Sequence, residues 1–195
     1  MHGIPGVPVD VYAGGNLAIP AFQPLTTAGP PATAAARVDA AVITQTLAVP
    51  SGANVSVVAN VEGGTPNLEA FANDLSPVVG GPSRVTVRHT ANAPAVDIAV
   101  DGTVAIPGLA PGTENSAVLP AGTYDFAVQV GGTTVIPLDG TVIPAGKNVI
   151  AYAVGDATAT PSTLTAVVQV LDVPVEMAPV MEAPAPVMAS PRMTG

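Results

Sequence analysis

Two histidines occupy equivalent places in this chain, and an aspartate follows each of them eight residues later. The two pairs are His2 with Asp10 and His89 with Asp97. If the fold brings a histidine and a carboxylate together, the pair could act as a general base or bind a metal ion. The presence of the same pair in both copies of a repeat favours a structural hydrogen bond or packing role over an active site.

Other catalytic patterns are absent from the sequence. It contains no GxSxG, no HExxH and no glycine-rich phosphate loop. There is no cysteine, so disulfides, thiolate zinc sites and cysteine nucleophiles are excluded. We therefore predict a protein without enzymatic activity and without a cofactor. An enzyme with a site at a domain junction that depends on His89 is the remaining alternative.

Three aspartates offer the oxygen ligands that calcium prefers, namely Asp97, Asp101 and Asp139. No DxDxDG loop surrounds them. Asp101-Gly102 and Asp139-Gly140 are first interpreted as hairpin turns, because glycine accepts a positive φ and aspartate tolerates one. Calcium binding stays an alternative to this structural interpretation.

The composition points to an all-β protein. The 195 residues are 48% hydrophobic but only 3% aromatic, and 20 glycines and 22 prolines interrupt the chain every few residues. Such spacing breaks helices and suits turns between short strands. The formal charge of −9 is opposite to that of a nucleic-acid-binding surface, so we expect no nucleic acid partner. No uninterrupted run of about 18 apolar residues occurs, so membrane insertion is not expected.

The chain contains an internal repeat. An offset of 87 matches His2 with His89 and gives seven identities in 21 ungapped positions, from 2–22 to 89–109. Further on, PSGANV from Pro50 matches PAGKNV from Pro144 at an offset of 94. The second copy therefore carries about seven extra residues, which are assigned to a hairpin of TYDFAVQV, Gly131-Gly132 and TTVIPL. Its large apolar residues alternate with polar or small ones, and the corresponding hairpin of the first copy must be shorter.

Each copy supplies about six or seven short strands, which is typical of a β-sandwich. We predict two tandem immunoglobulin-like β-sandwich domains, at residues 1–79 and 80–173, with SPVVGGPS as the linker between them. Residues 174–195 are rich in proline and methionine and are predicted to form an extended tail. Its methionines could bind reduced copper, but adaptable apolar contacts with a partner are the preferred interpretation.

The opening strand is present in one copy only. RVTVR, Arg84 to Arg88, precedes His89, whereas only Met1 precedes His2. Trimming of the chain is one explanation, and a strand supplied by a neighbouring subunit is the other. In the second case the tail is a candidate donor, and the predicted self-association residues are Val173, Val175, Met177, Val180 and Met181.

Several of these segments resemble a known family. VRHTANAPAVDIAVDG, LPAGTYDFAV, IPAGKNVIAYAVG and LTAVVQVLD are similar to domain of unknown function 4397 of bacteria and archaea. HGIPGVPVDVYAGG and PSGANVSVVANVEGG resemble a second member in tandem. The resemblance implies β-sandwich modules of secreted or cell-surface proteins with no established enzymatic activity. The proline- and methionine-rich tail lies outside it.

Two classes of function follow. The first is a non-enzymatic extracellular structural protein that self-associates, by β-strand exchange, into a cell-surface filament or layer. The alternative is a monomeric adhesion or ligand-binding module at the cell surface, although three tyrosines and no tryptophan leave few platforms for stacking sugars.

The first ten residues lack the basic and apolar segments of a signal peptide, so we expect an exported protein to be present here in its mature form.

Overall fold

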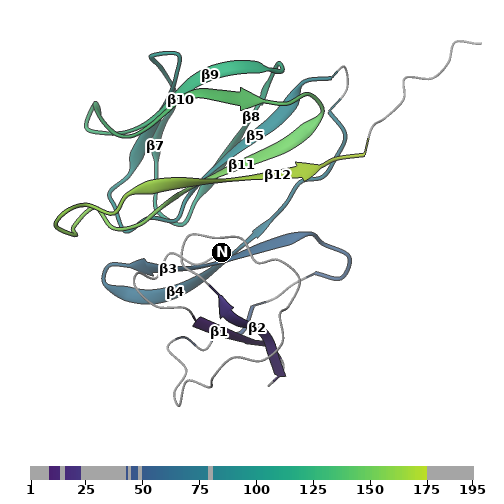
Figure 1. The fold of residues 1–195 in the computed structure, drawn as a ribbon, viewed down its shortest axis with the longest axis vertical. Helices are drawn as coiled ribbons and strands as arrows, with labels where there is room; N and C mark the ends of the chain where they lie inside the picture. Colours follow the sequence, from purple (N-terminus) through teal and green to yellow (C-terminus); the bar gives the residue numbers. More distant parts are fainter. Residues whose placement is uncertain are drawn as a thin grey trace, which may run out of the picture.

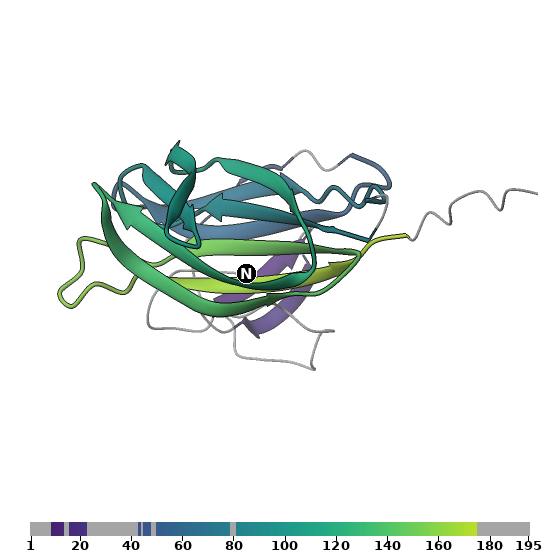
Figure 2. The same cartoon turned by 90° about the horizontal axis from the view of Figure 1, so that it is seen from above.

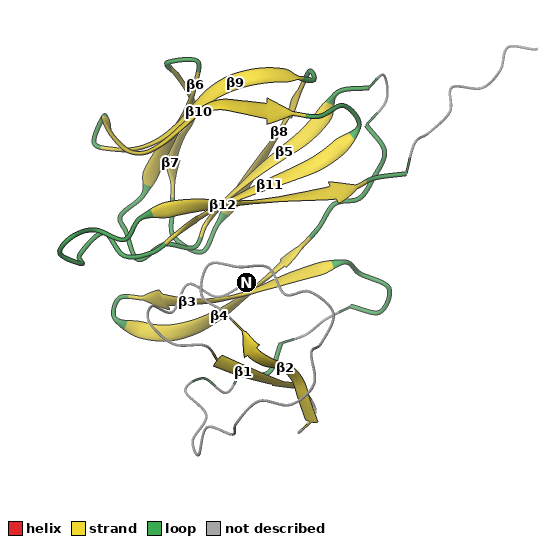
Figure 3. Ribbon diagram, viewed as in Figure 1, coloured by secondary structure: helices red, strands yellow, loops and turns green. Residues whose placement is uncertain are grey.

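The computed structural model describes residues 9–13, 16–22, 43, 45–47, 50–78 and 81–174. All regular elements in these ranges are β-strands, and none is a helix (Figure 3). The predicted all-β class is therefore confirmed for the part of the chain that is described. In the same part, no helix is long and apolar enough to cross a membrane.

Within the described residues, twelve strands make up four sheets. In chain order they are β1 (Val9–Ala13), β2 (Asn16–Phe22), β3 (Val55–Glu62), β4 (Thr65–Ala72), β5 (Ser83–His89), β6 (Val96–Val100), β7 (Thr103–Leu109), β8 (Glu114–Leu119), β9 (Gly122–Val130), β10 (Thr133–Ile143), β11 (Lys147–Val154) and β12 (Thr165–Asp172).

The eight strands from β5 to β12 form two facing sheets, one with the order β10-β9-β6-β7 and the other with the order β12-β11-β5-β8 (Figures 1 and 2). Apolar side chains from both sheets fill the space between them, because alternate residues of each strand point to the same face. The buried set includes Val85, Val87, Val96, Ile98, Leu109, Phe126, Val128, Ile136, Ile143 and Val149. This arrangement confirms the sandwich part of the predicted fold.

The first strand of the sandwich lies in the middle of its sheet. β5 pairs in parallel with β11 and antiparallel with β8. In the constant-type immunoglobulin order, by contrast, the first strand lies at a sheet edge. The strand order therefore does not confirm the immunoglobulin-like part of the prediction.

Two predicted turns have different outcomes. Asp101-Gly102 is the hairpin turn between β6 and β7, with φ of 48° and 77° at the two residues, as the sequence predicted. The prediction for Asp139-Gly140 was wrong, because both residues lie inside β10. They form an irregularity in its pairing with β9 between Leu138 and Thr141, and the positive φ of Gly140 serves this bulge.

The internal repeat is visible in the strand pairing. β1 pairs with β2 through Val9↔Phe22 and Val11↔Ile19, and β6 pairs with β7 through Val96↔Leu109 and Ile98↔Ile106. The second set of pairs is the first shifted by 87, and the register irregularities fall at the same places. The two hairpins thus repeat in backbone pairing as well as in sequence.

The hairpin of β3 and β4 packs against the outer face of the β12-β11-β5-β8 sheet (Figure 1). Val58 and Phe71 of the hairpin lie in one apolar cluster with Ile150, Tyr152 and Val154 of β11. The predicted domain limits at residues 79 and 173 stay predictions. Most of the predicted tail, residues 175–195, lies outside the described residues.

The end of β11 provides a test of the fold. Gly155 has φ of 100°, and a β-carbon at this position would lie 2.2 Å from the carbonyl oxygen of Thr163. Gly131 also has a positive φ, but a β-carbon there would meet no atom within 4 Å. We expect Gly155→Ala to lower the free energy of unfolding by about 2–4 kcal/mol and Gly131→Ala by about 1 kcal/mol. Urea unfolding of both variants checks this, and equal losses would contradict the close approach at Gly155.

Candidate functional site

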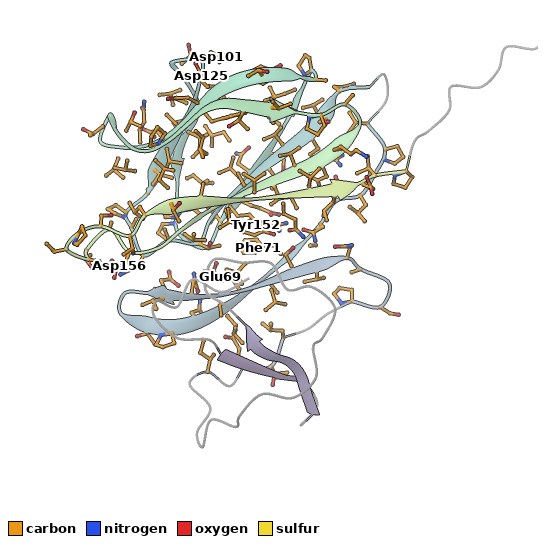
Figure 4. All side chains as sticks on the ribbon, in the orientation of Figure 1. Glu69, Phe71, Asp101, Asp125, Tyr152 and Asp156 are labelled. Atoms are coloured by element: carbon orange, nitrogen blue, oxygen red, sulfur yellow. The ribbon has the colours of Figure 1, made fainter. Side chains whose placement is uncertain are left out.

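Arg88 is buried between the sandwich and the β3–β4 hairpin. It belongs to the outer face of β5, and its side chain is only 1% exposed. Phe71 of β4 and Tyr152 of β11 enclose the guanidinium, whose central carbon lies 4.7 Å and 5.3 Å from the centres of the two rings. Figure 4 shows these two aromatic side chains between the hairpin and the sheet. Stacking of this kind suits the planar, weakly hydrated guanidinium.

Each nitrogen of the Arg88 guanidinium donates a hydrogen bond. Nε donates to Glu114 at 2.7 Å, Nη1 to the hydroxyl of Tyr152 at 2.8 Å, and Nη2 to the backbone carbonyl of Ala72 at 3.3 Å. The Tyr152 hydroxyl in turn donates to Oε1 of Gln169 at 2.9 Å. A buried charge is tolerated only when it is paired and hydrogen-bonded in this way. The network therefore connects β4, β5, β8, β11 and β12.

Further polar contacts connect the hairpin and its following loop to the sandwich. Asn60 donates to the carbonyl of Thr90 at 3.2 Å, and Asn148 donates to the carbonyl of Asp74 at 2.9 Å. Arg84 forms an ion pair of 3.0 Å with Asp74. The loop after β4 is thus fixed at several points, so that the predicted linker begins in a segment held against the sheet.

Glu69 lies in the same interface, on β4 (Figure 4). Its Oε1 atom accepts a hydrogen bond from Asn67 at 3.4 Å. Burial raises the pKa of the Glu69 carboxyl above its usual range, and the carboxylate of Glu62 adds to this increase. The amides of Asn60 and Asn67 oppose it only in part. The hairpin interface therefore favours the protonated form of Glu69.

His89 is fully buried and has a structural role. Its Nε2 atom lies 2.8 Å from the carbonyl oxygen of Pro94, so Nε2 carries the proton. Burial lowers the pKa of His89 below its usual range, which favours the neutral ring. Asp97 instead accepts a hydrogen bond from the backbone N–H of Gly108 at 2.7 Å. The structure does not join His89 and Asp97 in a catalytic pair, and His2 with Asp10 is not described as a pair because His2 lies outside the described residues.

Two of the three aspartates named as calcium ligands, Asp97 and Asp101, accept hydrogen bonds from backbone N–H groups. Asp101 accepts from the N–H of Asp125 at 2.9 Å, and Asp125 accepts from the N–H of Gly140 at 2.7 Å (Figure 4). This relay joins the β6–β7 turn to the bulge in β10, the strand that contains Asp139. Within the described part of the chain, no three His, Asp or Glu residues gather closely enough to hold a metal ion.

The residues predicted for self-association are described only at their start. Val173 follows β12 and is buried in its own chain. Val175, Met177, Val180 and Met181 lie outside the described residues. A strand donated by the tail would therefore begin after Val173.

Sequence reasoning did not find Arg88, although a signal was present. In RVTVR the valines alternate with Arg84, Thr86 and Arg88, and alternation normally places the polar residues in solvent. Two of the chain's five basic residues thus share one face of one strand. Two arginines on one strand face indicate that carboxylates, carbonyls or aromatic rings pack against that face.

The sheet edges differ in how they are protected. β7 and β10 each contain a proline and two register irregularities, and both features discourage pairing with another chain. β8 is six residues long and begins with Glu114-Asn115-Ser116. β12 has the sequence TAVVQVLD and pairs with β11 through eight residues without irregularity. It contains no proline or lysine, and its only charge is Asp172 at its last position.

A comparison with protein families matches residues 1–99 to the family described as Domain of unknown function (DUF4397). The match covers just over half of the chain. The chain belongs to this family. The match shows one DUF4397 domain, which extends through β5 into β6, and it does not show a tandem pair. No curated protein matches the chain.

The hydroxyl of Tyr152 provides a test of the buried network. Tyr152→Phe removes the acceptor of one Arg88 hydrogen bond and the donor to Gln169, so we expect a loss of about 1.5–3 kcal/mol in the free energy of unfolding. Tyr124→Phe is the matched control, because the Tyr124 hydroxyl donates only to the carbonyl of Pro120, at 3.0 Å and near the surface. Its loss should be about 1 kcal/mol or less. Urea unfolding measures both losses. A larger loss for Tyr124→Phe than for Tyr152→Phe would show that the Arg88 network is not a main contact between the hairpin and the sandwich.

Glu69 provides a test with pH. Its folded-state pKa is raised, so the protonated form stabilises the fold, and this contribution is lost as the pH rises through the folded pKa. Glu69→Gln mimics the neutral group and should unfold at higher urea concentration than the wild-type protein at pH 7. The difference should disappear below about pH 4, the range of an unperturbed glutamate. His89 is present in both proteins, so its contribution cancels in the difference between their stabilities. A difference that does not change with pH would contradict this assignment.

Proposed function

We propose that this protein is a non-enzymatic structural protein of the cell surface that self-associates through β-strand pairing into a filament or layer. The observation that carries the proposal is the edge strand β12. It is long and regular, lacks the proline and the bulges that protect β7 and β10, contains no lysine, and exposes two valines. Val168 is 44% exposed and Val170 is 51% exposed. Among the described strands, only β11 pairs with β12, and an edge of this kind readily pairs with another chain.

The use of polar side chains in the described residues supports the same function. Arg88, His89, Asp97, Asp101 and Asp125 all hydrogen-bond to groups of their own chain. His89, Asp97 and Asp101, which the sequence suggested for catalysis or calcium binding, thus have structural partners. The outward-facing backbone of an edge strand supplies the hydrogen-bonding groups that association by strand pairing requires.

We propose in addition that the first repeat builds a second sandwich, so that the chain is a tandem of related modules. The matching registers of β1–β2 and β6–β7 support this. So does the correspondence between PSGANV, which leads into β3, and PAGKNV, which leads into β11. Strand exchange by residues after Val173 remains part of the proposal, as does the cell-surface location implied by the family resemblance. Neither the tandem arrangement nor the strand exchange requires an immunoglobulin-like strand order.

A charge placed on β12 tests the proposal. Val170→Lys puts an ammonium group at the centre of the exposed edge, and we expect it to reduce self-association at least tenfold, because a charge must be desolvated when strands pair. Val118→Lys on β8 is the matched control, since Val118 is 54% exposed and the added charge is the same. Light scattering over a concentration series and electron microscopy of the full chain measure the effect. A wild-type protein that stays monomeric at every concentration would rule out the proposed function.

A further inference from the structure

The side chains of β12 divide between two faces of the sheet. Val167, Gln169 and Leu171 face the β3–β4 hairpin, where Val167 and Leu171 pack on the apolar cluster of Val58 and Phe71. Ala166 and Val168 face the interior of the sandwich, where they line a cavity of about 30 Å³ between the sheets. Val170 belongs to this second set, because it lies two residues from Val168. The two exposed valines are therefore neighbours on one face of the edge strand.

On the strength of the proposed self-association, we infer that β12 pairs antiparallel with β12 of a second copy of this chain around a two-fold axis at Gln169. In this register Val168 of each copy lies opposite Val170 of the other. Directly opposite residues of an antiparallel pair have side chains on the same face of the sheet, so the four valines form one apolar group. The two β12-β11-β5-β8 sheets become one continuous sheet. The same surface serves both copies, as a two-fold interface requires.

The charges on β12 are compatible with this register. Asp172 lies opposite Ala166 of the second copy, so the two Asp172 carboxylates are at opposite ends of the contact. Each is also paired with Lys147 of its own chain at 2.5 Å. Like charges directly opposite each other would destabilise a strand pair, and the register avoids them.

Gln169 at the axis adds a polar contact. Its Oε1 atom accepts hydrogen bonds from Tyr152 at 2.9 Å and Ser56 at 3.4 Å. Its amide nitrogen donates to no other described residue, so it can donate across the axis to the second copy. Through Tyr152 this contact is continuous with the buried network of Arg88.

The choice of a second copy over the tail follows from two features. β12 is self-complementary in length, apolar pattern and charge position. The tail segment after Val173 contains prolines at 174, 179, 184, 186 and 191, which lack the N–H group that strand pairing uses. The symmetric contact closes on itself and yields a dimer, so a filament or layer needs a second, different contact.

Cross-linking tests the register, because the chain has no cysteine and each introduced thiol is therefore unique. Full-length Val168→Cys and Val170→Cys proteins are mixed and oxidised mildly. We expect a disulfide-linked dimer that contains one chain of each variant, at a yield at least fivefold above that of either variant alone. Directly opposite β-carbons are about 4.5–5.5 Å apart, whereas diagonal ones are about 7–8 Å apart. Val118→Cys on β8 is the control and should not cross-link.

Salt dependence gives a second readout. The formal charge of −9 opposes association of two copies, so added salt should strengthen the dimer. Preferential linkage of Val168→Cys to itself would overturn the register. The protein could instead assemble without forming cross-links on β12 and lose assembly when residues 175–195 are removed. That result would overturn this inference in favour of the tail, but the proposed function would stand. A chain that is monomeric in sedimentation at all concentrations would instead remove the proposed function itself.

Discussion

The buried guanidinium of Arg88 is the interaction on which the relation between the hairpin and the sandwich depends. Moving a charge of this size out of water costs several kcal/mol even after the protein relaxes. Glu114, Tyr152 and the carbonyl of Ala72 together offset that cost, and they come from three different strands. If the hairpin slid or rotated, at least one of these bonds would be lost and the charge would be left partly unpaired. An apolar interface alone has no such directional requirement.

The same reasoning explains why the outer face of the β12-β11-β5-β8 sheet differs from its inner face. Between the two sheets, valine, isoleucine and leucine pack without any directional bond, and the shape of the space decides which residues fit. On the outer face, β5 presents Arg84 and Arg88 to a carboxylate, to carbonyls and to aromatic rings. The interior thus supplies most of the stabilising burial, whereas the outer face fixes the angle and position at which the next structural unit lies.

Much of the fold follows from local patterns in the sequence. The alternation in TYDFAVQV and the Gly131-Gly132 turn predicted β9 and β10, and Asp101-Gly102 predicted the turn after β6, because these signals act over a few residues. The failure at Asp139-Gly140 has a physical reason. The same dipeptide that closes a hairpin also suits a bulge. Here β10 pairs with β9 on both sides of it, and the N–H of Gly140 donates to Asp125 of β9.

Contacts between distant segments were harder to predict. The parallel pairing of β5 with β11 joins residues more than 60 positions apart, and no local pattern distinguishes it from an antiparallel pairing. The burial of Arg88 depends on a hairpin from the preceding repeat, so RVTVR alone indicates a solvated polar face. The repeat itself was clear from the sequence, since an offset of 87 describes both the identities and the strand register.

Edges and faces together limit what the described part of this protein can do. The inner faces of the two four-stranded sheets cover each other, and the hairpin covers the outer face of the β12-β11-β5-β8 sheet. Its histidine and many of its polar side chains hydrogen-bond within the chain. Prolines and bulges protect β7 and β10, but β12 keeps an unbroken backbone and two exposed valines. Such an edge carries a risk of non-specific aggregation. A partner that fits the edge in one register removes that risk, because the valines and backbone groups are then satisfied by a defined neighbour.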